Sequence, residues 1–350
     1  VKQAIETIKA LKDKEGISGI PSGFKDIDKE TGGWQNSDLI IIAARPAMGK
    51  TAFLLSMARN IAVEHQVPLA LFSLEMASVQ LITRMIASET GISSEKLRKG
   101  QMNDEEWQRL FSNVSALENA PLYIDETPSL SVFDFRAKCR RLVMQHGVKI
   151  IMVDYLQLMT ANSGKGGAGN REQEIATISR SLKAIAKELN VPVIALSQLS
   201  RSVETRPGKR PMLSDLRESG AIEQDADIVS FIFRPEYYKI ATWDNDEDGG
   251  ESSTENQAEL IIAKHRNGAT ADVRMSFFKN IAKFADLDLF GNQYGTGGYQ
   301  PSNFGQLDAP SGFEKIKTTI DPGAAFDLPS KQNLSGSSMN DEDDDDDFQF

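Results

Sequence analysis

The sequence predicts an α/β domain built on a mostly parallel central sheet, with helices on both faces and an antiparallel hairpin at its C-terminal end. Two observations predict this class. Several short, almost entirely apolar segments follow one another along the chain, and segments with helical periodicity lie between them. Strands that are apolar on both faces are typical of parallel sheets covered by helices.

The individual elements follow from the same patterns. Six apolar segments are expected as buried strands: 39–44, 68–74, 121–124, 149–154, 191–197 and 226–233. The clearest helix between them is 172–189, which places five apolar residues on one face: Ile175, Ile178, Leu182, Ile185 and Leu189. After the last of these strands, 258–265 and 271–278 flank the turn-forming segment RNGAT and are expected as the hairpin.

The two ends of the chain differ from this middle part. Residues 1–16 carry an apolar stripe before Gly16 and are expected as a helix that docks on another surface. Because the chain starts at Val rather than Met, we interpret this helix as the link to an upstream domain. Residues 291–350 are rich in Gly, Ser and Pro and end in DEDDDDDFQF, a composition typical of disorder. The sequence therefore predicts a linker helix (1–16), one large domain (17–290) and a disordered, acid-ended tail (291–350).

Composition excludes several classes of protein. No run of 18 apolar residues predicts a membrane span, and no secretory signal is visible. The single cysteine, Cys139, excludes an internal disulfide and argues against a zinc site, so a cytoplasmic location is expected. The net charge of −11 belongs mainly to 291–350, which hold three lysines and eleven acidic residues. The acidity of the whole chain is therefore no argument against a DNA partner.

A phosphate-binding loop is expected where the strand 39–44 runs into RPAMGKT and then into a helix. The pattern G-x-x-x-x-G-K-S/T is broken at one position, because Ala44 stands where the first glycine is expected. Backbone N–H groups of such loops bind phosphate oxygens. The predicted ATP-binding segment is therefore Arg45, Pro46, Ala47, Met48, Gly49, Lys50 and Thr51, of which all but Pro46 have a backbone N–H. Lys50 would reach the β- and γ-phosphates and Thr51 would bind Mg²⁺. A chance GKT in a loop is the alternative, which the strand and helix on either side disfavour.

Three further polar residues end predicted strands. Asp154 ends 149–154 and is the candidate acid that supports Mg²⁺. Glu75 and Gln198 each end a predicted strand, and in a parallel sheet they would lie at the same edge as the phosphate loop. Glu75 could orient the attacking water and Gln198 could sense the γ-phosphate. For each, a solvated polar residue at a strand end is the alternative.

In their order and spacing, these segments resemble the C-terminal motor domain of the DnaB family, replicative DNA helicases with a RecA-like P-loop NTPase fold. The resemblance covers roughly residues 1–290 and rests on ISGIPSGFKDID, AARPAMGKTAF, FSLEM, VDYLQLM, ALSQLSR, DLRESGAIEQDADIV and KHRNG. Alanine at position 44 is usual in that family. Residues 291–350 carry no recognisable motif.

The resemblance implies roles for the nucleotide site. Lys50 and Thr51 look like the Walker A pair and Asp154 like the Walker B acid. Glu75 matches the catalytic glutamate and Gln198 the switch residue linked to the γ-phosphate.

The same family places the KHR motif in trans. Arg266 and Lys264 would project into the site of a neighbouring subunit, where a cation neutralises charge on the transferred phosphoryl group. Without the resemblance, these two residues would be interpreted as exposed charges of a hairpin.

The segment DLRESGAIEQDAD (215–227) resembles the family's DNA-contacting loop. Arg217, Glu218 and the backbone of Gly220 match the contact positions best, and a polar surface loop with an Arg–Glu pair is the alternative. Residues 164–169, GKGGAG, are interpreted as a second mobile loop near the channel or as a simple linker.

The resemblance thus implies an ATP- and Mg²⁺-dependent DNA helicase, a homohexameric ring that moves 5′→3′ on single-stranded or forked DNA. The helix 1–16 would pack on an adjacent subunit, and primase and a helicase loader are expected partners of the full-length protein. Two alternatives remain: a RecA-like recombinase that binds single strands without unwinding, and an assembly factor that uses ATP as a switch. The acidic tail is interpreted either as a solubilising end or as a docking peptide for a replication partner.

Overall fold

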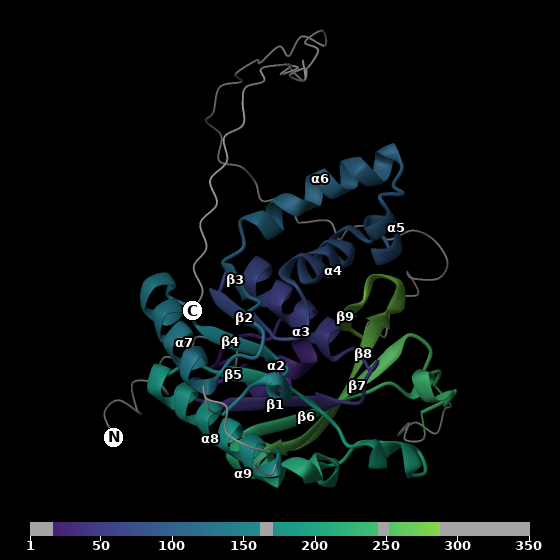
Figure 1. Cartoon of the computed structure of the whole chain (residues 1–350). Helices are drawn as coiled ribbons and strands as arrows, with labels where there is room; N and C mark the ends of the chain where they lie inside the picture. The colour runs from purple at the N-terminus through teal and green to yellow at the C-terminus, as the bar shows by residue number, and fades with distance from the viewer. Residues whose placement is uncertain (1–16, 162–170, 244–251, 288–350) are drawn as a thin grey trace, which may run out of the picture. The chain divides into compact units, whose positions relative to one another are not determined.

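A nine-stranded sheet is the centre of the described part of the chain, residues 17–161, 171–243 and 252–287 of a computed structural model (Figure 1). Its strands are β1 (Leu39–Ala44), β2 (Leu69–Ser73), β3 (Leu122–Asp125), β4 (Ile150–Asp154), β5 (Val193–Gln198), β6 (Ile228–Phe233), β7 (Gln257–His265), β8 (Ala271–Phe278) and β9 (Lys283–Asp286). Their order in the sheet is β3-β2-β4-β5-β1-β6-β7-β8-β9. The first six strands in this order are parallel, and β7, β8 and β9 are antiparallel. The predicted parallel sheet with a C-terminal antiparallel hairpin is confirmed.

Helices alternate with the parallel strands. The α-helices are α2 (Lys25–Thr31), α3 (Lys50–Arg59), α4 (Ser78–Thr90), α5 (Ser94–Lys99), α6 (Asp104–Glu118), α7 (Val132–His146), α8 (Arg171–Leu189) and α9 (Gly220–Asp225). One π-helical turn, η1 (Asn60–Glu64), extends α3. The 3₁₀ turns are η2 (Leu156–Leu158), η3 (Arg201–Thr205), η4 (Leu213–Ser219), η5 (Pro235–Tyr238) and η6 (Lys279–Ile281).

Both faces of the sheet are covered, as the apolar runs predict. On one face, Ile41 of β1 lies in an apolar core with Leu182 of α8 and Phe135 of α7. On the other face, Ile42 lies in a second core with Phe53 of α3. All six residues of β1 are buried, because alternate side chains of one strand enter opposite cores.

Two features differ from the prediction. The short strand β9 pairs with β8, so the predicted hairpin is not the edge of the sheet; its sequence KFAD is too short to show a period. The expected loop 215–227 is instead mostly helical, because η4 and α9 occupy 213–225. Leu216 and Ile222, which are 3% and 0% exposed, anchor these turns on the domain.

Several predicted segments lie outside the described residues: the helix 1–16, the glycine-rich segment 164–169 and the tail 291–350. Among the helices that the structure describes, none combines the length and the apolar character needed to cross a membrane.

Candidate functional site

The phosphate loop connects β1 to α3 through residues 45–49. The backbone of Gly49 has φ +96°, a left-handed conformation that favours glycine. A Cβ at this position would also lie 3.1 Å from the ring of Phe284, so both the conformation and the space call for glycine. Ala47 adopts positive φ as well, at 65°. Successive backbone N–H groups in such conformations can form a concave anion-binding site, here beside the N-terminus of α3.

The predicted ATP-binding residues of this loop differ in their surroundings. Pro46 and Ala47 are exposed and line a cavity, whereas Met48 is 2% exposed and belongs to the apolar core. Arg45 also reaches the cavity, but its guanidinium is held by Glu204 at 3.0 Å and by the carbonyl of Leu199 at 2.9 Å. The side chain of Met48 therefore packs, and only its backbone is available to a phosphate.

Lys50 and Thr51 at the start of α3 and Asp154 at the end of β4 form the polar centre of the site next to the loop. The hydroxyl of Thr51 donates a hydrogen bond of 2.7 Å to Oδ2 of Asp154. The amine of Lys50 lies 3.5 Å from the carbonyl of Ala44 and 5.3 Å from the centre of the Tyr155 ring. Burial lowers the pKa of this amine, although the carboxylates of Asp154 and Glu75 oppose the shift.

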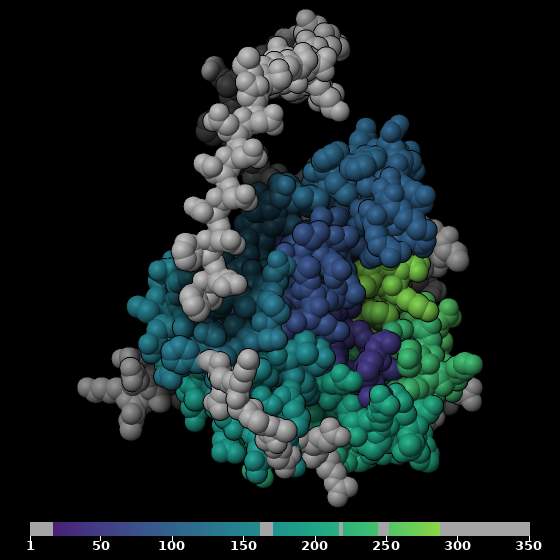
Figure 2. Space-filling model, viewed as in Figure 1, coloured from purple at the N-terminus to yellow at the C-terminus, as the bar shows by residue number. Residues whose placement is uncertain are grey.

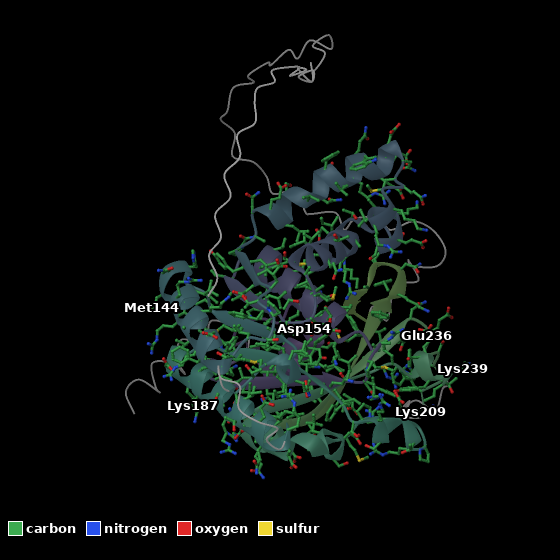
Figure 3. All side chains as sticks on the ribbon, viewed as in Figure 1. Met144, Asp154, Lys187, Lys209, Glu236 and Lys239 are labelled. Carbon is green, nitrogen blue, oxygen red and sulfur yellow. The ribbon has the colours of Figure 1, made fainter. Side chains whose placement is uncertain are left out.

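Asp154 fits a cation at this centre. The residue is 1% exposed, and its second oxygen, Oδ1, is buried without a hydrogen-bond partner among the described residues. Burial raises the pKa of the carboxyl, which the hydrogen bond from Thr51 partly offsets. A buried carboxylate oxygen beside a threonine hydroxyl offers the hard oxygen ligands that Mg²⁺ prefers, with phosphates and water completing its shell. In Figure 3, Asp154 lies centrally among the strands, while Met144 and Lys187 lie on the outer helices.

Glu75 and Gln198 lie at the same edge of the sheet as the phosphate loop. In the strand register, Ser73 of β2 is opposite Asp154 and Ala44 of β1 is opposite Gln198, so four neighbouring strands end together. Glu75 follows β2 and is exposed, and Gln198 is the exposed last residue of β5. Both line the cavity of about 500 Å³ that contains the loop residues Gly49, Lys50 and Thr51. Figure 2 shows one face of the molecule, where purple atoms from early in the chain lie in a hollow between the teal and green parts.

Three polar residues that line this cavity are not among the predicted site residues: Arg84 of α4, Ser94 at the start of α5, and Tyr155. The positive charge of Arg84 acts on Asp154 and favours its ionised form. The position of Arg84 could have been inferred from helical periodicity, because it lies beside the buried stripe of Leu81 and Met85. Its direction toward the phosphate loop depends on how α4 packs, which no motif records.

Lys264 and Arg266 do not join this cavity. They lie at the C-terminal end of β7, which is antiparallel to β6, and Ile228 of β6 is opposite His265. The amide of Asp227 donates to the carbonyl of Leu39, so this end of β7 lies beside the first residue of β1. The six residues of β1 separate it from the phosphate loop by about 20 Å, at roughly 3.3 Å per residue. Arg266 is thus at the opposite edge of the sheet from the phosphate loop of its own chain.

The predicted DNA-contacting segment, 215–227, is held in place at its first residue. Asp215 is 2% exposed and accepts two hydrogen bonds from the guanidinium of Arg206, at 2.8 and 3.0 Å. Arg217 and Glu218 lie in the backbone of η4, and their side chains are outside the described set. Gly220 begins α9 and is exposed, and a Cβ there would meet no atom within 4 Å. An exposed backbone at this position is available to a phosphate.

Comparison with known proteins agrees with this geometry. The family model of the DnaB-like helicase C terminal domain matches residues 19–286. Over 287 residues the chain is 50% identical to the replicative DNA helicase DnaB of Geobacillus stearothermophilus and 48% identical to the replicative DNA helicase DnaC of Bacillus subtilis. These matches cover 82% of this chain and 61% of each relative, so the chain spans about three-fifths of the length of these relatives.

Solved structures give the same result. One solved ATPase domain superimposes with a TM-score of 0.73 at 38% identity, covering 82% of this chain and 98% of that one. A DnaB-like replicative helicase, solved in a study of its interactions with primase, gives 0.71 at 39% identity and covers 82% of this chain and 67% of that one. These likenesses confirm the RecA-like fold that the motifs predict. The chain therefore belongs to the DnaB-like helicase C-terminal domain family.

Proposed function

We propose that this chain is the ATP-driven motor of a replicative DNA helicase, acting as a homohexameric ring on single-stranded and forked DNA. The observation that carries the proposal is the convergence of Lys50, Thr51, Asp154, Glu75 and Gln198 at one edge of the sheet, in a chain of the DnaB-like family. The names of the relatives, replicative DNA helicases, support the same activity.

ATP would bind with its phosphates against the loop 45–49 and the N-terminus of α3. Lys50 would bind the β- and γ-phosphates, while Thr51 and Oδ1 of Asp154 would hold Mg²⁺. When bound, Mg²⁺ neutralises charge on the phosphate oxygens. Glu75, exposed to the cavity, would orient and polarise the attacking water, and Gln198 would respond to the γ-phosphate.

Hydrolysis would need a second protomer. Arg266 and Lys264 lie at the sheet edge away from their own phosphate loop, which supports a role at the site of a neighbour. A trans-acting guanidinium of this kind raises the rate on the order of 10³–10⁵-fold. Head-to-tail contacts would place the Arg266 side chain of each protomer, the arginine finger, in the nucleotide site of the next protomer, and such contacts close into a ring. The number of six subunits is inferred from the family.

DNA would be held by the turns η4 and α9 through Arg217, Glu218 and the backbone of Gly220. Backbone N–H groups and a local cation suit a strand that is followed by its phosphates rather than its bases. Movement in the 5′→3′ direction follows the family resemblance.

The proposal extends to other proteins. Primase and a helicase loader are proposed partners of the full-length protein, and the primase interactions of one structural neighbour support the first of them. Replication of DNA would take place in the cytoplasm.

The proposal is tested by Glu75→Gln, with Glu105→Gln on the exposed surface of α6 as the matched control. The first change should lower ATP hydrolysis stimulated by single-stranded DNA by on the order of 10²-fold or more, with binding of ATP retained. The control should keep the wild-type rate. Full activity of Glu75→Gln would contradict the assigned site.

The unchanged protein separates helicase from the alternatives. Unwinding of a forked duplex with a 5′ single-stranded arm is expected. Strong stimulation of hydrolysis by single strands without unwinding would indicate a recombinase-like motor, and very slow turnover even with DNA would indicate an ATP-switch assembly factor.

A further inference from the structure

Lys264 and Arg266, the two cations proposed to act on the neighbouring site, are hydrogen-bonded to the predicted DNA-contacting residues 215–227 of their own chain, here called the DNA segment. The amine of Lys264 donates to the carbonyls of Glu223 and Ala226, the latter at 2.8 Å. The guanidinium of Arg266 donates to the carbonyl of Gln224 at 3.2 Å. These carbonyls belong to the C-terminal end of α9 and to the residue that follows it, where unpaired carbonyls favour positive charge.

Asp227 completes this connection. Its carboxylate is 4% exposed and binds Nη1 of Arg266 at 3.0 Å, and its carbonyl accepts the backbone N–H of Arg266 at 2.8 Å. The other carboxylate oxygen accepts the amide of Leu39 at 2.8 Å and pairs with the amine of Lys183. One buried side chain therefore fixes the end of β7 relative to β1 and α8.

The connection between α9 and the end of β7 is short, because Asp227 lies between α9 and β6 in the chain. Asp227 follows α9 by two residues and immediately precedes β6, which pairs with β7. A shift of η4 and α9 must move the carbonyls that hold Lys264 and Arg266, or break those hydrogen bonds. The side chain of Arg266 is 49% exposed, so it remains accessible to a ligand outside the chain.

We propose that Asp227 is a positioning residue for Arg266, and that Asp227 and the end of α9 transmit the state of the DNA segment in one protomer to the nucleotide site of its neighbour. The proposal rests on the proposed ring motor, because it needs Arg266 to act in trans. Coupling between two sites is reciprocal, so loss of the finger must also alter the DNA segment of its own chain.

The direct test is Asp227→Asn, which keeps the size of the side chain and removes its charge. We expect the ratio of ATPase rates with and without single-stranded DNA to fall about tenfold, within the usual range of coupling between sites. The change should lower kcat with DNA and leave KM for ATP unchanged. Lys183→Gln is the matched control, because it removes a partner of the same carboxylate without touching Arg266. It should lower the Tm but keep the ratio; an unchanged ratio in Asp227→Asn, or an equal loss in both variants, would overturn the proposal.

A double variant distinguishes failure of this proposal from failure of the ring motor. If Asp227 acts through Arg266, then Asp227→Asn should cause no further loss of activity in an Arg266→Ala background. Additive losses would overturn the positioning role while leaving the trans finger intact. Wild-type activity of Arg266→Ala alone would instead contradict the proposed motor, on which this proposal depends.

A second measurement does not require Asp227→Asn to fold. In the nucleotide-free full chain, Arg266→Ala should increase amide hydrogen exchange over 220–226 about tenfold, because α9 loses a bond at its end. Arg201→Ala, an exposed cation of η3, is the control and should leave this segment unchanged. Unaltered exchange in Arg266→Ala would overturn the coupling.

Discussion

Asp154 shows how the chemistry of the proposed site acts against the stability of the domain. A carboxyl group whose pKa is raised by folding costs stability at every pH above that pKa, and the cost disappears as the pH falls and the group is protonated. Burial raises the pKa of Asp154, and Oδ1 has no partner among the described residues, so at neutral pH the ionised group carries this cost.

Asp154→Asn should therefore stabilise the nucleotide-free protein while abolishing Mg²⁺-dependent ATP hydrolysis. The neutral amide keeps an oxygen for the hydroxyl of Thr51 and removes the buried charge. We expect the free energy of unfolding to rise by roughly 1 kcal/mol, measured by denaturant titration without nucleotide. Asp154→Ala is the comparison, since it removes the hydrogen bond and leaves a cavity. If Asp154→Asn were less stable than the wild type, burial of the charge would not be the dominant cost.

At the scale of residues, the sequence predicts much of the nucleotide site but not the residues that α4 and α5 contribute to the cavity. Lys50, Thr51 and Asp154 belong to motifs whose spacing relative to strands carries their position, and the structure brings them together. Arg84 and Ser94 enter the same cavity from α4 and α5. Their positions depend on how these helices pack on the sheet, and a single sequence contains no direct signal of that packing.

At the scale of elements, apolar strands can be predicted and polar helices cannot. Except for β3, whose four residues are all half-buried, the strands β1 to β8 are buried on at least one face, and this burial requires the apolar runs that reveal them. The turns η4 and α9 have few apolar residues, and ion pairing between Arg206 and Asp215 supports them in addition to the buried Leu216 and Ile222. Pairing between residues nine positions apart leaves no periodic pattern, so the sequence predicts a loop there.

Gly220 of α9 is not required by the fold, but its backbone is a proposed DNA contact. Its φ of −53° is ordinary for any residue, and a Cβ would meet no atom within 4 Å. Gly220→Ala should therefore keep the fold and stabilise the helix by about 1 kcal/mol or less. If the backbone at 220 contacts a DNA phosphate, the added methyl group should nevertheless weaken binding of single-stranded DNA several-fold, measured by fluorescence anisotropy at fixed salt.

Gly49→Ala provides the contrast for Gly220→Ala. At position 49, φ is +96° and a Cβ would lie 3.1 Å from the Phe284 ring, so this change should lower the Tm. Wild-type DNA affinity of Gly220→Ala would argue against a backbone contact at that position.

At the scale of the whole molecule, the positions of Lys50 and Arg266 at opposite sheet edges predict how mixed assemblies behave. Arg266→Ala subunits doped into wild-type protein should reduce DNA-stimulated hydrolysis more than in proportion to their fraction. Each variant leaves its neighbour's site without a finger, and a ring that works in sequence is stalled by one inactive site. The measurement is ATPase rate against the fraction of variant at constant total protein. A strictly linear decrease would count against sequential use of fingers in trans.

The separation of phosphate loop and finger by the length of β1 has a consequence for the loading of such a ring. A closed ring has as many complete sites as protomers, but a ring opened at one junction has one site fewer. The protomer on one side of the gap keeps a phosphate loop with no finger, and the protomer on the other side keeps a finger with no phosphate loop. Opening to admit a DNA strand therefore silences the site at the gap, and restored turnover there signals that the ring has closed around its strand.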